Sequence, residues 1–150
     1  MSQIDSIFAI SAIDGRYRSK VENLAHITSE FGLIKYRTEV ECQWVLFLSD
    51  CTEIPEIPRL EAADRAFVTA IAANFDAVGA ARIKEIEATT NHDVKAVEYY
   101  LKEQFALRPN LQAINEWVHF GCTSEDINNT AYGLMVKAGV EDVLLVHMDQ

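Results

Sequence analysis

The chain has 150 residues, of which 49% are hydrophobic and 24% are charged, a composition typical of a folded globular chain and not of a disordered one. Its 13 basic and 23 acidic residues give a formal net charge of -10, which repels phosphate backbones at long range and argues against nucleic acid as a partner. The length suits one domain, or one domain with a piece of another, and a small anionic ligand remains compatible with it wherever cationic groups or backbone N–H donors gather.

The cysteines and the first residues of the chain indicate the cellular compartment in which the protein is expected. Cys42, Cys51 and Cys122 are odd in number and have no C-x-x-C spacing, which argues against a disulfide framework or a zinc site and fits a reducing environment. The start of the chain has no basic region ahead of a long apolar run, so no signal peptide is expected. Since no stretch approaches the length of a membrane span, we expect a cytoplasmic protein with no membrane partner.

The first polar motif in chain order is SAIDGRY, from Ser11 to Tyr17. Asp14 and Gly15 form a turn signal, and Arg16 beside Tyr17 presents a guanidinium next to a hydroxylated ring. Arginine suits phosphate because its planar fork donates two parallel hydrogen bonds. Taken alone, the motif favours a surface turn with an ordinary ion pair, and a phosphate contact is the alternative.

Helical periodicity dominates the chain. Apolar residues recur at close to 3.6-residue spacing from Thr28 to Leu48 and again from Leu60 to Phe75, which predicts helices there. Between them, CTEIPEIPRL (51–60) contains two prolines and predicts an extended linker. No convincing strand pattern is present, so the predicted fold class is all-α.

The second motif is TTNHDVKAVEYYLK, residues 89–102. Thr90 followed three residues later by Asp93 matches the [ST]-x-x-[DE] signature of a helix start, directly before apolar periodicity that runs to Phe105. Pro109 then disfavours helix at the residue before it. The sequence therefore predicts a helix that begins near Asp93 and ends before Pro109.

The third motif is HFGCTSEDINN, residues 119–129, where Thr123 and Asp126 repeat the same signature. A short helix over Leu111–Phe120 is expected before it and one long helix over Ser124–Gln150 after it. Apolar residues lie on more than one side of that long helix, and such a helix needs several neighbours. We therefore infer truncation, oligomerisation or both.

Both helix starts are candidate anion sites, because unpaired backbone N–H groups and the helix dipole favour negative ligands there. Each carries a histidine, His92 in the first turn of one and His119 just before the other. Ordinary caps with solvated or packed histidines are the alternative. The chain has no GxGxxG, GxxxxGK[ST] or HExxH pattern, and His26 and His147 lie in helical runs without acidic or cysteine ligands at metal spacing, so no metal site is predicted.

Taken in order, ISAIDGRY, TTNHDVKAVEYYLK and HFGCTSEDINN resemble the adenylosuccinate lyase family of the fumarase/aspartase superfamily, from about residue 9 to the end of the chain. The resemblance implies an N-terminal helical domain at 1–112 and, at 113–150, the first long helix of a central helical bundle. It implies β-elimination that releases fumarate from adenylosuccinate and from succinylaminoimidazole carboxamide ribotide in purine biosynthesis, without metal or organic cofactor. Members form homotetramers whose active sites combine residues of three subunits.

The resemblance also assigns binding roles within the three motifs, whereas the acid histidine and the basic serine of the family lie further along and have no counterpart in this span. The chain alone is therefore expected to be inactive. Another lyase of the superfamily, or a non-catalytic helical interaction module, is the alternative. His119 is expected to assist near the phosphate. The implied substrate-binding residues are Arg16 and Tyr17 for the nucleotide, Asn91, His92 and Asp93 lining the site, and Thr123 and Ser124 for the succinyl portion.

Overall fold

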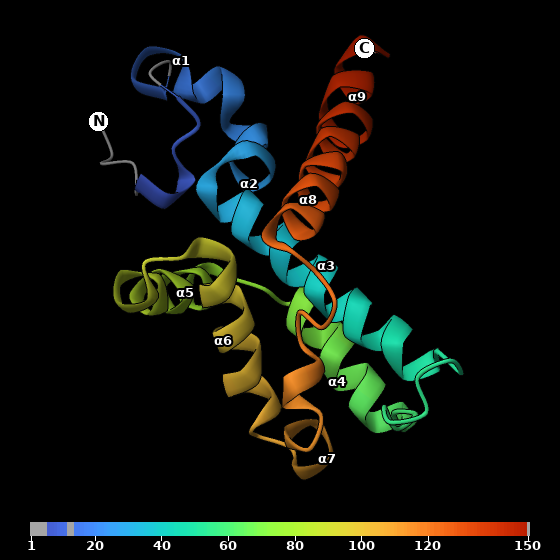
Figure 1. The fold of residues 1–150 in the computed structure, drawn as a ribbon. Coiled ribbons are helices and arrows are strands. Elements are labelled where there is room, and N and C mark those ends of the chain that lie inside the picture. Colours follow the sequence, from blue (N-terminus) through green and yellow to red (C-terminus); the bar gives the residue numbers. More distant parts are fainter. Residues whose placement is uncertain (1–5, 12–13, 150) are drawn as a thin grey trace.

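A computed structural model describes residues 6–11 and 14–149, and within them every regular element is a helix (Figure 1). The all-α prediction is confirmed. The elements are η1 (Ser6–Phe8), α1 (Asp14–Val21), η2 (Glu22–Leu24), α2 (Ala25–Thr28), α3 (Glu30–Asp50), α4 (Ala62–Ala73), α5 (Ala77–Thr90), α6 (Asp93–Phe105), α7 (Pro109–Gln112), η3 (Asn115–Trp117), α8 (Ser124–Ala138), η4 (Gly139–Leu144) and α9 (Leu145–Met148).

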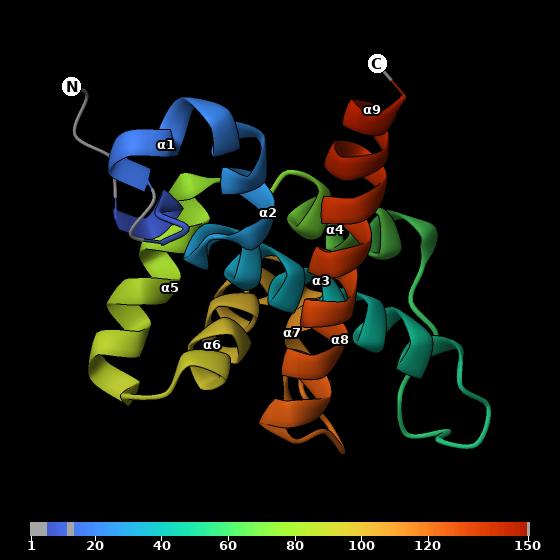
Figure 2. The same cartoon turned by 90° about the horizontal axis from the view of Figure 1, so that it is seen from above.

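The central element is α3, which contacts α2, α4, α5, α6 and α8. Figures 1 and 2 show it running through the middle of the molecule, with α8 and α9 rising along one side. The main hydrophobic core lies where α3 meets α4 to α7, and a smaller cluster around Ile27, Tyr36 and Ala131 lies between α2, α3 and α8. Helix α3 is therefore covered on opposite sides, so its buried residues do not form a single stripe.

The helix predicted over Thr28–Leu48 is present as α3, which begins at Glu30 after the extended Ser29 and ends at Asp50. The linker over 51–60 is confirmed as non-helical, but it contains turns and is not extended throughout. The stripe over Leu60–Phe75 corresponds to α4. Helix α5 follows as a separate element, which the apolar periodicity does not distinguish. It begins where the Asp76 carboxylate accepts hydrogen bonds from Val78 N and Gly79 N, each at 3.0 Å.

Among the described helices, none is by itself long and apolar enough to cross a membrane. The pair α4 and α5 reaches that length and composition only together, and the two helices are bent by 86° at their junction.

The turn expected at Asp14–Gly15 is wrong, because Asp14 begins α1. Its carboxylate accepts hydrogen bonds from Ile10 N and Ser11 N, each at 2.6 Å, and pairs with Arg18 one helical turn further on at 2.9 Å. These bonds stabilise the start of a helix where the residue types alone suggest a turn.

The prediction that one short helix covers Leu111–Phe120 is also wrong. Helix α7 ends at Gln112, the path is interrupted at Ile114 (φ -110°, ψ 15°), and η3 follows. Val118 is then extended (ψ 129°) and buried, which turns the chain away from the helical path before the third motif begins.

The long helix expected over Ser124–Gln150 is confirmed through Met148, with a π-helical stretch, η4, between α8 and α9; Gln150 lies outside the described residues. Only Ile127 and Ala131 of α8 are buried. Many apolar side chains of this helical run are exposed, namely Tyr132, Val136, Val140, Leu144, Leu145, Val146 and Met148. The domain boundary predicted after residue 112 stays a prediction.

Candidate functional site

The second motif forms the junction of α5 and α6, and it is capped differently from the sequence expectation. Helix α5 continues to Thr90, and Asn91 ends it in the left-handed conformation (φ 52°). The N-cap of α6 is His92, whose Nδ1 accepts a hydrogen bond from Lys95 N at 3.2 Å. The capping box expected from Thr90 and Asp93 is therefore wrong, because Thr90 still belongs to the preceding helix, where its hydroxyl donates to His92 O.

The carboxylate of Asp93 is held by a buried arginine of α3. Arg37, only 5% exposed, donates from Nη2 to Asp93 at 2.7 Å and from Nε to Asn128 Oδ1 at 2.9 Å. Although partial burial acts to raise the pKa of Asp93, the Val94 N–H group and the Arg37 guanidinium outweigh it and hold that pKa below its usual value. One guanidinium thus joins the start of α6 to α8.

The loop before α8 is tied to α3 by two contacts. His119 has a positive φ of 64°, and its Nδ1 lies 2.5 Å from Oε1 of Glu41, a carboxylate with no exposed surface. Trp44 Nε1 donates to Phe120 O at 2.9 Å. Gly121 has a φ of 71°, a left-handed conformation that lets the loop change direction before α8. The loop is therefore anchored at two successive turns of α3.

The N-terminus of α8 carries the capping box that the sequence predicts from Thr123 and Asp126. The Asp126 carboxylate accepts from Thr123 N at 2.7 Å and from Thr123 Oγ1 at 2.9 Å, and these two bonds hold the pKa of Asp126 below its usual value. The Thr123 hydroxyl proton is committed to Asp126, so Thr123 can offer a ligand only its remaining oxygen lone pair. Ser124 is the first residue of α8 and is partly buried.

The predicted site residues fall into two groups in the structure. Arg37 of α3 brings Asp93 and the first turns of α8 together. One turn further along α3, Glu41 holds His119. Helix α1 lies apart from the N-terminus of α8 in both Figures 1 and 2. Its Tyr17 is 46% exposed, and the side chain of Arg16 lies outside the described residues.

Sequence reasoning missed Arg37, Glu41 and Asn128, which hold this arrangement together. The two residues of α3 left only a weak signal: they are oppositely charged and four positions apart, but Lys35 and Glu39 of the same helix have the same spacing and are not buried. Buried charges need partners, so such a pair indicates polar neighbours only once its burial is known. Asn128 left no comparable signal.

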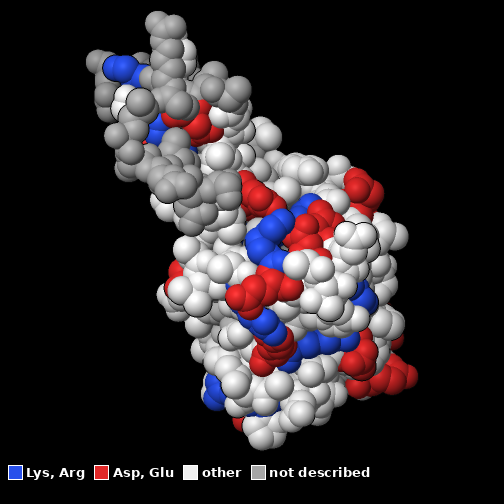
Figure 3. Space-filling model, turned by 90° about the vertical axis from the view of Figure 1, so that its left-hand side faces the viewer, with Lys and Arg blue, Asp and Glu red and all other residues white. Residues whose placement is uncertain are grey.

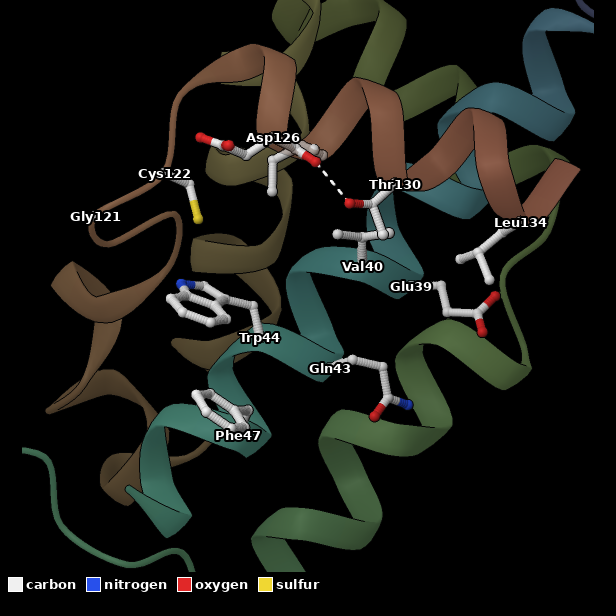
Figure 4. A pocket seen from close by; sticks show the side chains of 11 residues that line it. Glu39, Val40, Gln43, Trp44, Phe47, Gly121, Cys122, Asp126, Thr130 and Leu134 are labelled. Atoms are coloured by element: carbon white, nitrogen blue, oxygen red, sulfur yellow. Dashed lines mark hydrogen bonds between the residues drawn. The ribbon is translucent and has the colours of Figure 1, made fainter. Parts of the chain in front are cut away.

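A pocket of about 690 Å³ opens between α3 and α8 (Figure 4). Trp44 and Phe47 stack along its α3 wall with ring centroids 5.4 Å apart, and Cys122 points toward Trp44. The two charged residues that line the pocket, Glu39 and Asp126, are both acidic. This pocket therefore does not suit an anionic substrate.

A second pocket, of about 610 Å³, lies between α5 and α6. Its cations are paired with carboxylates: Arg82 contacts Glu103 at 2.6 Å, and Lys102 contacts Glu116 at 3.1 Å. The face drawn in Figure 3 shows the same pattern, with basic and acidic side chains interleaved. Among the described residues, no group of three or more His, Cys, Asp or Glu side chains is placed to hold a metal ion.

Comparison with known proteins identifies relatives along almost the whole chain. A protein family described as "Lyase" matches residues 15–150. The adenylosuccinate lyase of Vibrio cholerae serotype O1 is 54% identical over 95% of this chain, that of Escherichia coli K12 is 48% identical over 99%, and that of Haemophilus influenzae is 48% identical over 95%. The chain spans only 31–32% of the length of these relatives.

Proposed function

This chain belongs to the lyase family, and from that premise we propose that it is the N-terminal portion of an adenylosuccinate lyase. The observation that carries the proposal is the 54% identity with the Vibrio cholerae adenylosuccinate lyase over 95% of the chain. The intact protein would cleave adenylosuccinate to AMP and fumarate. It would also release fumarate from succinylaminoimidazole carboxamide ribotide.

The proposed reaction is a β-elimination. A base removes a proton from the succinyl carbon next to a carboxylate, the electrons of that C–H bond form the new C=C bond, and the C–N bond breaks with its electron pair going to nitrogen. An acid protonates the departing nitrogen. Negative charge builds up on the carboxylate during proton removal, so oriented donors stabilise the transition state. In this proposal, the acid and the base are supplied by parts of the enzyme beyond these residues.

The residues of this chain would bind the substrate. We assign the nucleotide phosphate to Arg16 and Tyr17 and the wall of the substrate site to Asn91, His92 and Asp93. The backbone N–H groups at the start of α8, that of Ser124 among them, are oriented donors for a carboxylate. We assign Thr123 to the same succinyl portion, which requires its N–H and hydroxyl to exchange Asp126 for the ligand. What supports this placement is the Arg37 bridge, which keeps the starts of α6 and α8 together in a chain whose net charge is otherwise unfavourable for anions.

We further propose a cytoplasmic homotetramer with composite active sites. The separation of α1 from the start of α8 supports it, since the nucleotide-binding motif of one copy would then complete the site of another. The exposed apolar side chains of α8, η4 and α9 support it as well, because such a surface favours burial against further helices.

The direct test is an assay of the intact protein with adenylosuccinate, in which AMP is separated chromatographically and fumarate is followed by ultraviolet absorbance. We expect equimolar AMP and fumarate, and no fumarate from argininosuccinate under the same conditions. Turnover of argininosuccinate without turnover of adenylosuccinate would assign the chain to another lyase reaction. Absence of turnover together with absence of AMP binding would support a non-catalytic role.

The phosphate assignment is tested with Arg16→Ala in the intact protein. A hydrogen bond to a charged group is worth about 1.5–3 kcal/mol, so KM for adenylosuccinate is expected to rise roughly 10- to 150-fold. Lys20→Ala serves as the control, because Lys20 is an exposed cation of the same helix, whereas Arg18 holds Asp14 and Phe8 O and supports α1 itself. An unchanged KM for Arg16→Ala would remove Arg16 from the site.

A further inference from the structure

The carboxylate of Glu41 is buried, although the hydrophobic core does not require a charged group at this position. It has no exposed surface, Oε1 contacts His119, and Oε2 has no hydrogen-bond partner among the residues that the structure describes. A buried carboxylate loses its hydration, and an apolar side chain would fill the same space without that cost. An incompletely satisfied buried ionisable group therefore calls for a functional explanation.

The backbone of the contacting residue is also unusual. His119 is not glycine and yet has a φ of 64°, which costs conformational energy and persists only where the surrounding structure imposes it. The hydrogen bond from Trp44 Nε1 to Phe120 O holds the next residue against α3. The loop is thus held in the conformation that directs the imidazole of His119 back to Glu41.

The pair also lies beside the proposed substrate site. Glu41 follows Arg37 by four residues, so the two side chains leave the same face of α3 about 5–6 Å apart at Cβ. Arg37 holds Asp93 and Asn128, whereas Glu41 holds His119. Two successive turns of α3 therefore position polar groups of α6, α8 and the loop between them.

We propose that Glu41 is a positioning residue for the lyase reaction: its carboxylate accepts a hydrogen bond from Nδ1–H of His119 and thereby directs Nε2–H to an anionic oxygen of the substrate. The ring then carries both protons, and its positive charge lies between the Glu41 carboxylate and the bound anion. This inference rests on the proposed function, because it takes the succinyl nucleotide as the ligand. It adds Glu41, which lies outside the three motifs, to the residues that organise the site.

The electrostatic surroundings are compatible with a shared proton. Burial raises the pKa of Glu41, and the hydrogen bond with His119 opposes that rise. The other titratable groups that face the pair are Glu98 on α6, Cys42 on α3, and Cys122 and Asp126 at the start of α8. All of these are acids. The neighbouring cation, Arg37, lies one turn away on α3 and is engaged with Asp93 and Asn128, so an approaching anion draws the shared proton onto the ring.

The test uses Glu41→Gln in the intact enzyme, because glutamine keeps the shape of the side chain and removes its charge. We expect KM for adenylosuccinate to rise at least about tenfold with kcat changed by about twofold or less, as for loss of a group that binds substrate and transition state equally. Glu39→Gln, on the same helix but outside this contact, is the control and should change neither.

A double-mutant cycle separates positioning from general support of the fold. If Glu41 acts through His119, Glu41→Gln adds nothing to the rise in KM in a His119→Asn background. Additive effects, or an unchanged KM for Glu41→Gln in an enzyme that cleaves adenylosuccinate, would overturn the inference. Should Glu41→Gln fail to fold, Glu41→Asp takes its place, because it keeps the charge and withdraws the carboxylate from His119; an unchanged KM for that variant would overturn the inference. A wild-type protein that cleaves no adenylosuccinate would instead contradict the proposed function.

Discussion

His92 closes the first turn of α6 with a ring nitrogen, so a structural role and a proposed substrate-binding role meet in one side chain. The two can be separated because asparagine is a good N-cap and carries no imidazole. His92→Ala is expected to lose both roles, with a lower kcat in the intact enzyme and about 1 kcal/mol less stability. His92→Asn should recover most of the stability and none of the kcat. Steady-state kinetics and urea unfolding of both variants measure this.

The informative comparison is between the two variants. If His92→Asn restored kcat together with stability, the imidazole would be a cap and nothing more, and the assignment of His92 to the substrate site would be wrong.

Asp93 makes the link between α6 and α3 dependent on pH. Its pKa is held below the usual value in the folded protein, so its ionised form contributes stability above the unfolded pKa, and this contribution is lost as the pH falls through the folded pKa. Asp93→Asn should therefore be less stable than the wild type near neutral pH and approach it in strongly acidic solution. Urea unfolding across this pH range tests the expectation, with the exposed Glu56→Gln as a control that should show no such convergence.

The start of α3 depends on a residue without a side chain. A Cβ on Gly32 would overlap the backbone carbonyl of Ile27, whereas a Cβ on Gly133 of α8 would meet nothing within 4 Å. Gly32 thus permits the sharp approach of α2 to α3 on which the small hydrophobic cluster depends.

These two glycines form a matched pair for a stability measurement. Gly133→Ala should stabilise the chain by about 0.5–1 kcal/mol, since alanine is the better helix former. Gly32→Ala should destabilise it by about 1–3 kcal/mol or more, because the backbone must move. Equal effects of the two substitutions in urea unfolding would show that α2 does not pack against α3 as described.

The two capping signatures illustrate what a local pattern can predict at the level of an element. Thr123 and Asp126 form the expected capping box because the chain arrives at α8 from an extended loop. Thr90 and Asp93 do not, because α5 runs through Thr90 and leaves only Asn91 to turn the chain before His92 caps α6. The same four-residue signature therefore has two outcomes, decided by how the preceding residues fold.

At the scale of the whole molecule, the described residues form a core around α3 and leave an apolar surface along α8, η4 and α9. If the proposed acid and base lie outside this chain, the 150-residue polypeptide should release no fumarate from adenylosuccinate at any concentration. Ultraviolet absorbance measures this, with the intact protein as the positive control. Steady fumarate release by the polypeptide alone would place the acid and the base within these residues.

The amino-acid sequence by itself determined the all-helical fold, the proline-containing linker, the helix starts near Asp93 and Ser124, and the resemblance carried by three motifs. These features depend on residues close together in the chain, where periodicity, capping and turn chemistry act. Only the tertiary structure decided that α5 ends at Thr90, that Arg37 joins Asp93 to Asn128, and that Glu41 holds His119. Those contacts join residues 56 to 91 positions apart, and a buried charge selects its partner from whatever the packing brings within reach.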